Sequence, residues 1–163
     1  MKKFITKSFC KINLNLKVLK KQNNGYHKIS SLITFCNLHD IITISKSNNS
    51  EDKITFTGKF KKGISKKNNT ITKVLDLFRQ KNLIKNQFFK INIHKNIPHG
   101  SGLGGGSSNA ASVINFLNLK LRLNTIKTEY LASKIGFDVP ICLQKKNLFI
   151  TGKKNEIIRS KKN

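Results

Sequence analysis

Apolar and polar residues alternate along residues 8–20, near the start of the chain. Every second residue from 12 to 18 is Ile, Leu or Val, and the positions between them hold lysine and asparagine. A period of two over this length predicts a β-strand with one buried face. On this pattern the apolar side chains are expected to be buried, and Lys11 is expected on the polar face of the strand.

The rest of the chain mixes helix and strand patterns without strict alternation. Apolar residues spaced three and four apart predict helices over 70–80, from near Ser107 onward, and over 127–134. Short apolar or alternating runs predict strands over 27–36, 40–46, 53–57, 88–94, 139–143 and 147–151. A length of 163 residues fits one domain with a real core. The mixture predicts an α+β fold, a mixed sheet packed against helices.

The most informative stretch covers residues 98–111 and reads PHGSGLGGGSSNAA. Five glycines fall within seven positions, directly before a predicted helix: Gly100, Gly102, Gly104, Gly105 and Gly106. Glycine allows φ > 0 and a close approach of the backbone to a ligand. A helix N-terminus adds unpaired N–H groups and the positive end of the helix dipole. The junction therefore predicts an anion site, with phosphate as the usual anion.

Other interpretations of this stretch are a glycine turn with a purely structural role and two better-known nucleotide loops. A Walker A loop is excluded because no Lys-Ser or Lys-Thr pair follows the glycines. A Rossmann fingerprint fits poorly, because it should open the first βαβ unit, whereas this loop lies about two-thirds of the way along the chain.

Composition adds a strong positive charge, formally +25 at pH 7. Of the 32 basic residues 29 are lysine, and the chain also has 20 asparagines, as AT-rich codons would produce. A nucleic-acid surface is the competing interpretation, because lysines neutralise phosphates. The lysines do not cluster with aromatic residues, so stacking on single strands is not indicated. We expect no nucleic-acid partner, although the positive field favours anionic ligands.

The chain shows no membrane, secretion or metal signal. No run of 18 apolar residues occurs, and the N-terminus lacks the apolar core of a signal peptide. Three distant cysteines without metal spacing predict reduced packing residues in a cytoplasmic protein. His39, His94 and His99 have no metal-ligand spacing either, and we expect them at the surface.

The residue order of the glycine-rich stretch resembles the phosphate loop of the galactokinase, homoserine kinase, mevalonate kinase and phosphomevalonate kinase superfamily. Three further segments are similar to one family within it, the 4-diphosphocytidyl-2-C-methyl-D-erythritol kinases. They are SFCKINLNL at residues 8–16, Gly-Tyr-His at 25–27 and Gly-Phe-Asp-Val-Pro at 136–140. Asn69, before a predicted helix, matches more weakly. The resemblance runs from about residue 6 to about residue 158.

The resemblance implies transfer of the γ-phosphoryl group of ATP, with Mg²⁺, to the 2-hydroxyl of 4-diphosphocytidyl-2-C-methyl-D-erythritol, a step toward isoprenoid precursors. It implies that Lys11 and Asp138 are catalytic. It places Asn13 in the methylerythritol pocket and Tyr26 and His27 on the cytosine. The implied ATP-binding residues are Asn69, Pro98, Gly100, Ser101, Gly102, Leu103, Gly104, Gly105, Gly106, Ser107 and Ser108.

The chemistry of Lys11 and Asp138 agrees with the resemblance if the two meet at one site. Asp138 would accept or orient the proton of the attacking hydroxyl. Lys11 would keep Asp138 ionised and lower the pKa of the hydroxyl. The alternatives are an ordinary polar-face lysine and an ordinary acid in a turn.

The resemblance also implies a fold like the second domain of ribosomal protein S5, and it raises a question of length. Members of the family are nearly twice as long, so we expect residues 1–163 to be the ATP-binding N-terminal domain, without the family's C-terminal domain. Two alternative functions stay open, a basic RNA-binding module and an inactive nucleotide-binding remnant. The sequence does not indicate an oligomeric state.

Overall fold

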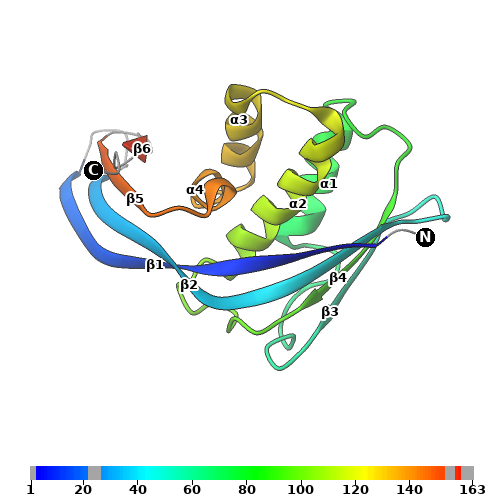
Figure 1. Cartoon of the computed structure of the whole chain (residues 1–163), viewed down its shortest axis with the longest axis horizontal. Coiled ribbons are helices and arrows are strands. Elements are labelled where there is room, and N and C mark those ends of the chain that lie inside the picture. The colour runs from blue at the N-terminus through cyan, green and yellow to red at the C-terminus, as the bar shows by residue number, and fades with distance from the viewer. Residues whose placement is uncertain (1–2, 22–26, 153–156, 159–163) are drawn as a thin grey trace.

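The computed structural model describes residues 3–21, 27–152 and 157–158, and for 18–21, 27–29, 151–152 and 157–158 it describes the backbone only. In this part of the chain six strands form one sheet, and four helices lie on one of its faces (Figure 1). This arrangement confirms the predicted α+β class. None of the helices described is long and apolar enough to cross a membrane.

The sheet is built around the long second strand. Strand order is β3-β4-β2-β5-β6, and β1 pairs with the other edge of β2. The first part of β2 pairs with β5 and its last six residues pair with β4, so β2 joins two sections of the sheet. Among the strands that the structure describes, only β3 and β4 pair in parallel. The strands are β1 (Phe4–Lys21), β2 (His27–Lys46), β3 (Lys53–Thr57), β4 (Phe89–His94), β5 (Leu148–Gly152) and β6 (Ile157–Ile158).

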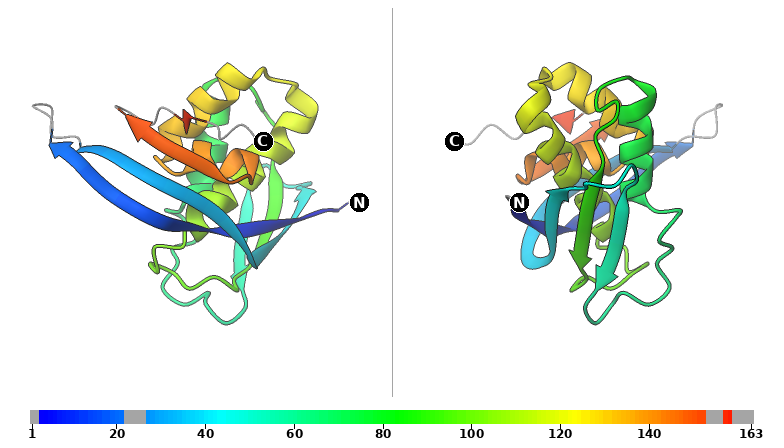
Figure 2. Two further views of the ribbon diagram at one scale, coloured as in Figure 1. Left: turned by 60° about the vertical axis from the view of Figure 1, so that its left-hand side comes forward. Right: turned by 90° about the vertical axis from the view of Figure 1, so that its right-hand side faces the viewer.

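The helices gather over one end of the sheet, and the β1–β2 ribbon extends beyond them as a curved arm (Figures 1 and 2). Helix α2 lies at the centre of the helical layer, in contact with the other three helices and with β1 and β2. The helices are α1 (Thr70–Gln80), α2 (Gly105–Leu121), α3 (Thr125–Ile135) and α4 (Val139–Gln144). The predicted helices over 70–80 and 127–134 and the helix after the glycines are confirmed.

The main core lies between α1, α2 and the β2–β4 section of the sheet. Alternate residues of β2 and β4 point into it, and α2 contributes small alanines that allow close packing on the sheet. A smaller cluster under the arm joins β2, β5 and α4 through Ile33, Ile141, Leu148 and Ile150. The two clusters fix α2 and α4 against the sheet, and the residues that begin these two helices form the site described below.

The strand predicted over residues 8–20 is confirmed as part of β1, but the prediction of which of its side chains are buried is wrong. Leu14 and Leu16 are 61% and 57% exposed, whereas Lys11 is only 4% exposed. The pairing of β1 with β2 shifts register within 9–11 and again within 13–15. In the first shift β1 advances by two residues and β2 by four, so the additional residues are on β2, and the additional residue on β1, Leu14, comes after Lys11. Lys11 is buried because β1 lies against the glycine loop and Asp138 at this point, whereas residues 13–17, further along β1, are exposed on both faces of the strand.

Two other predictions about elements are corrected. Residues 139–143, expected as a strand, form helix α4, with Pro140 in its first turn. A short apolar run does not by itself distinguish strand from helix, and proline fits the first turn because its missing N–H would be unpaired there anyway. The strands expected over 27–36 and 40–46 are one continuous strand, β2.

Candidate functional site

The glycine-rich loop ends in a helix N-terminus whose backbone donors are free. Gly104 adopts the left-handed conformation, with φ of 66°, and α2 begins at the next residue. No side chain among the described residues caps this end. The N–H of Ser108 makes the first helical hydrogen bond, to the Gly104 carbonyl at 2.9 Å, so the N–H groups of residues 105–107 lack a partner in the helix. This is the geometry that binds an anion.

The loop forms one wall of a cavity of about 510 Å³. Loop residues 98–107 line it, and further lining residues come from the segment before α1 and from the start of α1: Ser65, Asn68, Asn69, Thr70 and Lys73. The structure thus gathers in one cavity nearly all the residues for which the resemblance implies ATP binding. Ser108 is the exception, because it is buried and its hydroxyl donates to Cys142 Sγ at 3.3 Å.

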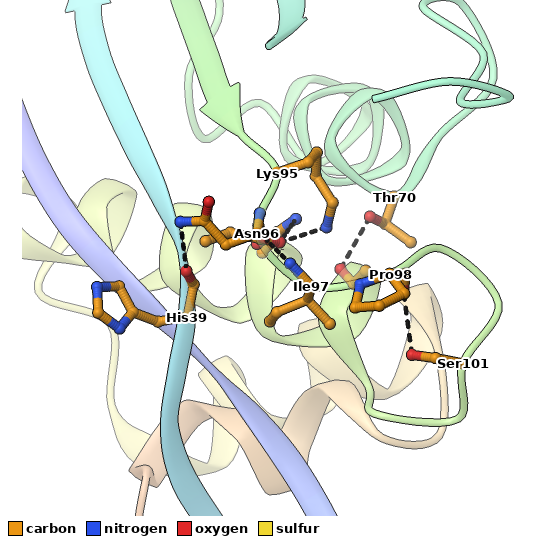
Figure 3. Close-up of polar contacts among 10 residues, drawn as sticks. His39, Thr70, Lys95, Asn96, Ile97, Pro98 and Ser101 are labelled. Atoms are coloured by element: carbon orange, nitrogen blue, oxygen red, sulfur yellow. Dashed lines mark hydrogen bonds and ion pairs between the residues drawn. The ribbon is translucent and has the colours of Figure 1, made fainter. Parts of the chain in front are cut away.

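Contacts within the loop hold it in shape. Ser101 Oγ donates to the Pro98 carbonyl at 2.9 Å (Figure 3). The same figure shows Thr70, which lies on the neighbouring helix α1. Thr70 Oγ1 donates to the Gly106 carbonyl at 2.9 Å and so ties the start of α1 to the start of α2. The two helix N-termini are therefore joined directly at the cavity.

Asn69 lines the cavity, but its side chain already has partners. It caps α1 by accepting the N–H groups of Ile71 and Thr72 at 2.9 and 3.1 Å. Its amide nitrogen donates to the Ser65 and Lys66 carbonyls. Because its polar atoms already have these partners, the Asn69 side chain shapes the wall of the cavity.

Lys11 contacts the glycine loop through its backbone N–H and through the carbons of its side chain. Its backbone N–H donates to the Leu103 carbonyl at 2.8 Å. A Cβ atom at Gly104 would lie 3.2 Å from Lys11 Cβ and 3.3 Å from Lys11 Cε, so a glycine is needed where the lysine passes. The absent side chain at Gly104 lets β1 and the loop approach each other.

The far end of Lys11 meets Asp138. Lys11 Nζ lies 3.0 Å from Asp138 Oδ2, although β1 and the start of α4 are at opposite ends of the sequence. The ammonium also donates to Asn13 Oδ1 at 3.4 Å. The Asp138 side chain remains 39% exposed, so its carboxylate is open to a ligand. The structure therefore brings together Lys11, Asp138, Asn13 and the loop.

Two residues that the resemblance assigns to the cytosine are not defined by the structure. Tyr26 lies outside the described residues. His27 begins β2, and its side chain is outside the description. Their roles stay predictions.

Three residues important to the loop escaped the sequence analysis: Asp40, Lys95 and Asn109. All three are buried, and Lys95 and Asn109 line the cavity. The available signal was Asp40, a single acid within the apolar pattern of β2, because a buried carboxylate needs partners. Its partners, however, come from other elements that only the fold brings near.

The histidines and cysteines make no metal cluster in the described part of the chain. His94 and His99 are exposed as expected, whereas His39 is half-buried beside the Phe9 ring. The three thiols are free, as predicted. Burial raises the pKa of the Cys142 thiol to about 11, and the neighbouring Asp138 carboxylate contributes in the same direction.

This raised pKa predicts a loss of stability in alkali. Between about pH 9 and pH 11 the folded thiol keeps its proton while the unfolded thiol releases it, so the free energy of unfolding falls as pH rises. Urea unfolding should show Cys142 lowering stability by about 1.4 kcal/mol at pH 10 relative to pH 8. The Cys142→Ala protein should lose this part of the pH dependence. An equal slope in both proteins would contradict the prediction.

Comparison with known proteins agrees with this geometry. Residues 69–146 match the family model for the GHMP kinases N terminal domain. The 4-diphosphocytidyl-2-C-methyl-D-erythritol kinase of Pelagibacter ubique is 45% identical over 141 residues, covering 85% of this chain and 50% of that protein. The kinase of the same name from Thermosipho africanus is 36% identical over 153 residues, covering 94% and 53%. The chain spans about half the length of the curated relatives it matches.

Solved structures share the fold. A crystal structure of 4-(cytidine 5'-diphospho)-2C-methyl-D-erythritol kinase superposes with a TM-score of 0.75 at 24% identity, covering 95% of this chain and 55% of the other. Homoserine kinase from Cytophaga hutchinsonii gives 0.70 at 16% identity, covering 96% and 51%.

The glycine loop followed by an uncapped helix on one face of a mixed sheet agrees with the family match, which makes residues 69–146 similar to the N-terminal domain of the GHMP kinases. Within that superfamily its curated relatives are 4-diphosphocytidyl-2-C-methyl-D-erythritol kinases, as the residues of four separate segments predicted.

Proposed function

We propose that this protein uses ATP to phosphorylate the 2-hydroxyl of 4-diphosphocytidyl-2-C-methyl-D-erythritol, giving ADP and the 2-phosphate. The proposal takes its acceptor from the name of the relatives. The observation that carries it is the 3.0 Å ion pair of Lys11 and Asp138 beside a helix N-terminus with free N–H groups. A kinase needs an anion site and a proton acceptor next to each other. The helix N-terminus is suited to the first role, and the Asp138 carboxylate is suited to the second.

The glycine loop would hold the phosphates of ATP. Phosphoryl transfer depends on positioning and on neutralising charge on the phosphoryl oxygens, with little covalent help from the protein. The free N–H groups of residues 105–107 and the positive end of the α2 dipole are suited to this task. In the transfer, the bond from the γ-phosphorus to the β–γ bridging oxygen breaks, and a bond to the oxygen of the acceptor hydroxyl forms.

Asp138 would take the proton released from that hydroxyl. Its carboxylate is partly exposed, and Lys11, almost fully buried, supplies a fixed positive charge 3.0 Å away. A cation in this place keeps a carboxylate ionised and lowers the pKa of a bound hydroxyl. Asn13, within 3.4 Å of the Lys11 ammonium, would contact the acceptor, with Tyr26 and His27 on its cytosine.

Mg²⁺ would supply further charge neutralisation on the phosphates. In kinase sites it is held largely by phosphate oxygens and water, with one or two protein oxygens. Asn109 lines the cavity, and its Oδ1 is buried and lacks a hydrogen-bond partner within the described residues, so this oxygen would suit a hard cation or a donor. The Ser107 hydroxyl, also in the cavity wall, is a second candidate ligand.

We further propose that these residues form the N-terminal, ATP-binding domain of a cytoplasmic enzyme. The relatives are about twice as long as the stretch they share with this chain, which supports a second domain in a complete enzyme of this kind. Such a domain would complete the pocket for the acceptor.

The decisive test is transfer of labelled γ-phosphate from ATP to 4-diphosphocytidyl-2-C-methyl-D-erythritol, with calorimetry of Mg-ATP in parallel. We expect labelled 2-phosphate and ADP in equal amounts, and no labelled product when CDP replaces the acceptor. Binding of Mg-ATP without transfer would favour the inactive remnant. A folded protein that binds no Mg-ATP would overturn the proposal, and tight, sequence-selective RNA binding would then favour the RNA-binding module.

A further inference from the structure

A buried carboxylate lies directly behind the glycine loop. Asp40, on β2, is fully buried and receives hydrogen bonds from both sides of the loop. On the entry side, its Oδ1 accepts the N–H groups of Asn96 and Ile97 at 2.8 and 2.9 Å. On the exit side, its Oδ2 accepts from Asn109 Nδ2, on α2, at 3.0 Å. One side chain therefore fixes the residues before the loop and the helix after it.

Lys95 completes this arrangement with a buried ion pair to Asp40 Oδ2. The lysine lines the cavity, and its Nζ would lie 3.4 Å from a Cβ atom placed on Gly105. Ile97 packs even closer to the same glycine, at 3.0 Å from that Cβ position. The contacts to Asp40 thus hold both side chains against the first turn of α2, where the free N–H groups are.

The residue before Asp40 also makes a hydrogen bond to the segment that enters the loop. Asn96 Nδ2 donates to the His39 carbonyl at 3.0 Å, so β2 is tied to the entry of the loop through two consecutive residues (Figure 3). Buried carboxylates are costly unless they are paired and hydrogen-bonded, and Asp40 has four donors on its two oxygens. The donors to Asp40 come from both ends of one loop, so its contacts do more than stabilise β2 itself.

We propose that Asp40 is a positioning residue that holds the glycine loop in the shape that receives phosphate. It acts through Lys95, the N–H groups of Asn96 and Ile97, and Asn109, and does not itself touch the nucleotide. The inference deepens the proposed function and rests on it, because the loop is taken to be the phosphate site.

The chain contains a matched control at the other end of β4. Asp52 Oδ1 accepts the N–H of Phe89 at 2.8 Å, and its Oδ2 pairs with the Arg79 guanidinium at 2.8 Å. Like Asp40, it binds a backbone N–H and a cation, but it binds the start of β4, whereas the glycine loop follows the other end of that strand. Asp40→Asn and Asp52→Asn remove the same charge and the same kind of contacts.

The experiment compares these two variants by amide hydrogen exchange and by calorimetry of Mg-ATP. In Asp40→Asn the amide nitrogen faces the donors of Lys95 and Asn109, so we expect faster exchange over residues 96–107 and an affinity for Mg-ATP lowered about tenfold or more. Asp52→Asn should lower the melting temperature while its exchange over 96–107 and its affinity stay within about twofold of the unaltered protein. Equal effects of the two variants would overturn the proposal.

A second variant covers the case in which Asp40→Asn does not fold. Asp40→Asn combined with Lys95→Met leaves no buried charge unpaired, and we expect it to fold and to show the same fast exchange over 96–107. Native exchange in this variant would also overturn the proposal. The exchange readout needs no nucleotide, so a loop controlled by Asp40 in a protein that binds no Mg-ATP would count against the proposed function alone.

Discussion

Asp138→Asn is expected to lower the turnover for phosphoryl transfer about 10²-fold or more while leaving the affinity for Mg-ATP nearly unchanged. The amide keeps the size and shape of the side chain but cannot accept the proton of the acceptor hydroxyl. Asp138 begins α4 without a side-chain hydrogen bond to that helix, so the substitution should not disturb the fold. Single-turnover kinetics with labelled ATP would measure the effect on the chemical step.

Lys11→Met should cost a similar amount, because it removes the charge 3.0 Å from Asp138. A lysine that only fills space beside the loop would tolerate methionine with little loss of turnover. Asp76→Asn, the same chemical change as Asp138→Asn at an exposed position of α1, is the control and should have no effect. Near-normal turnover in Asp138→Asn would show that positioning alone accounts for the rate, and the role proposed for Asp138 would be abandoned.

Gly104→Val is expected to remove measurable binding of Mg-ATP from a protein that still folds. The residue has φ of 66°, which a β-branched side chain rarely adopts. A Cβ atom there meets Lys11 at 3.2 Å, so valine displaces the lysine as well as straining the loop. Calorimetry with Mg-ATP would measure the loss, and circular dichroism would establish that the variant is folded.

Gly102 offers a comparison in the same loop. Its φ is 74°, close to that of Gly104, but a Cβ atom there has nothing within 4 Å. Gly102→Val therefore carries the backbone strain without the collision with Lys11, and its loss of affinity should be clearly smaller. Unchanged affinity in a folded Gly104→Val protein would remove the glycine loop from the binding site.

Local pattern was sufficient for most elements and for the junction of the glycine loop with a helix N-terminus. The alternation of residues 8–20, the helical spacing of 70–80 and the glycines before a helix each depend on neighbours in the chain. Conformational preference and periodicity act over the same short range, so these features were predictable. Where local pattern was ambiguous, as in the apolar run at 139–143, the prediction failed, because a short strand and a short buried helix require similar residues.

The faces of β1 illustrate what periodicity cannot determine. Lys11 is buried where β1 lies against the glycine loop and Asp138, whereas Leu14 and Leu16 are exposed, together with the polar residues beside them. Which side chains of a strand are buried depends on the distant segments that pack against it, and these are not visible in the alternation of one strand. The expectation that Lys11 lies on a polar, outward face was reasonable from β1 alone and is wrong in the folded protein.

The sequence by itself determined the class of fold, the glycine loop and, through resemblance, the candidates Lys11 and Asp138. Only the tertiary structure decided that these two side chains meet at 3.0 Å, and that Asp40 holds both sides of the loop with Lys95, 55 residues away along the chain. The physical reason is the range of the forces concerned. Helices, turns and caps depend on residues a few positions apart, whereas an ion pair or a buried hydrogen-bond network depends on which distant segments the packed core brings into contact.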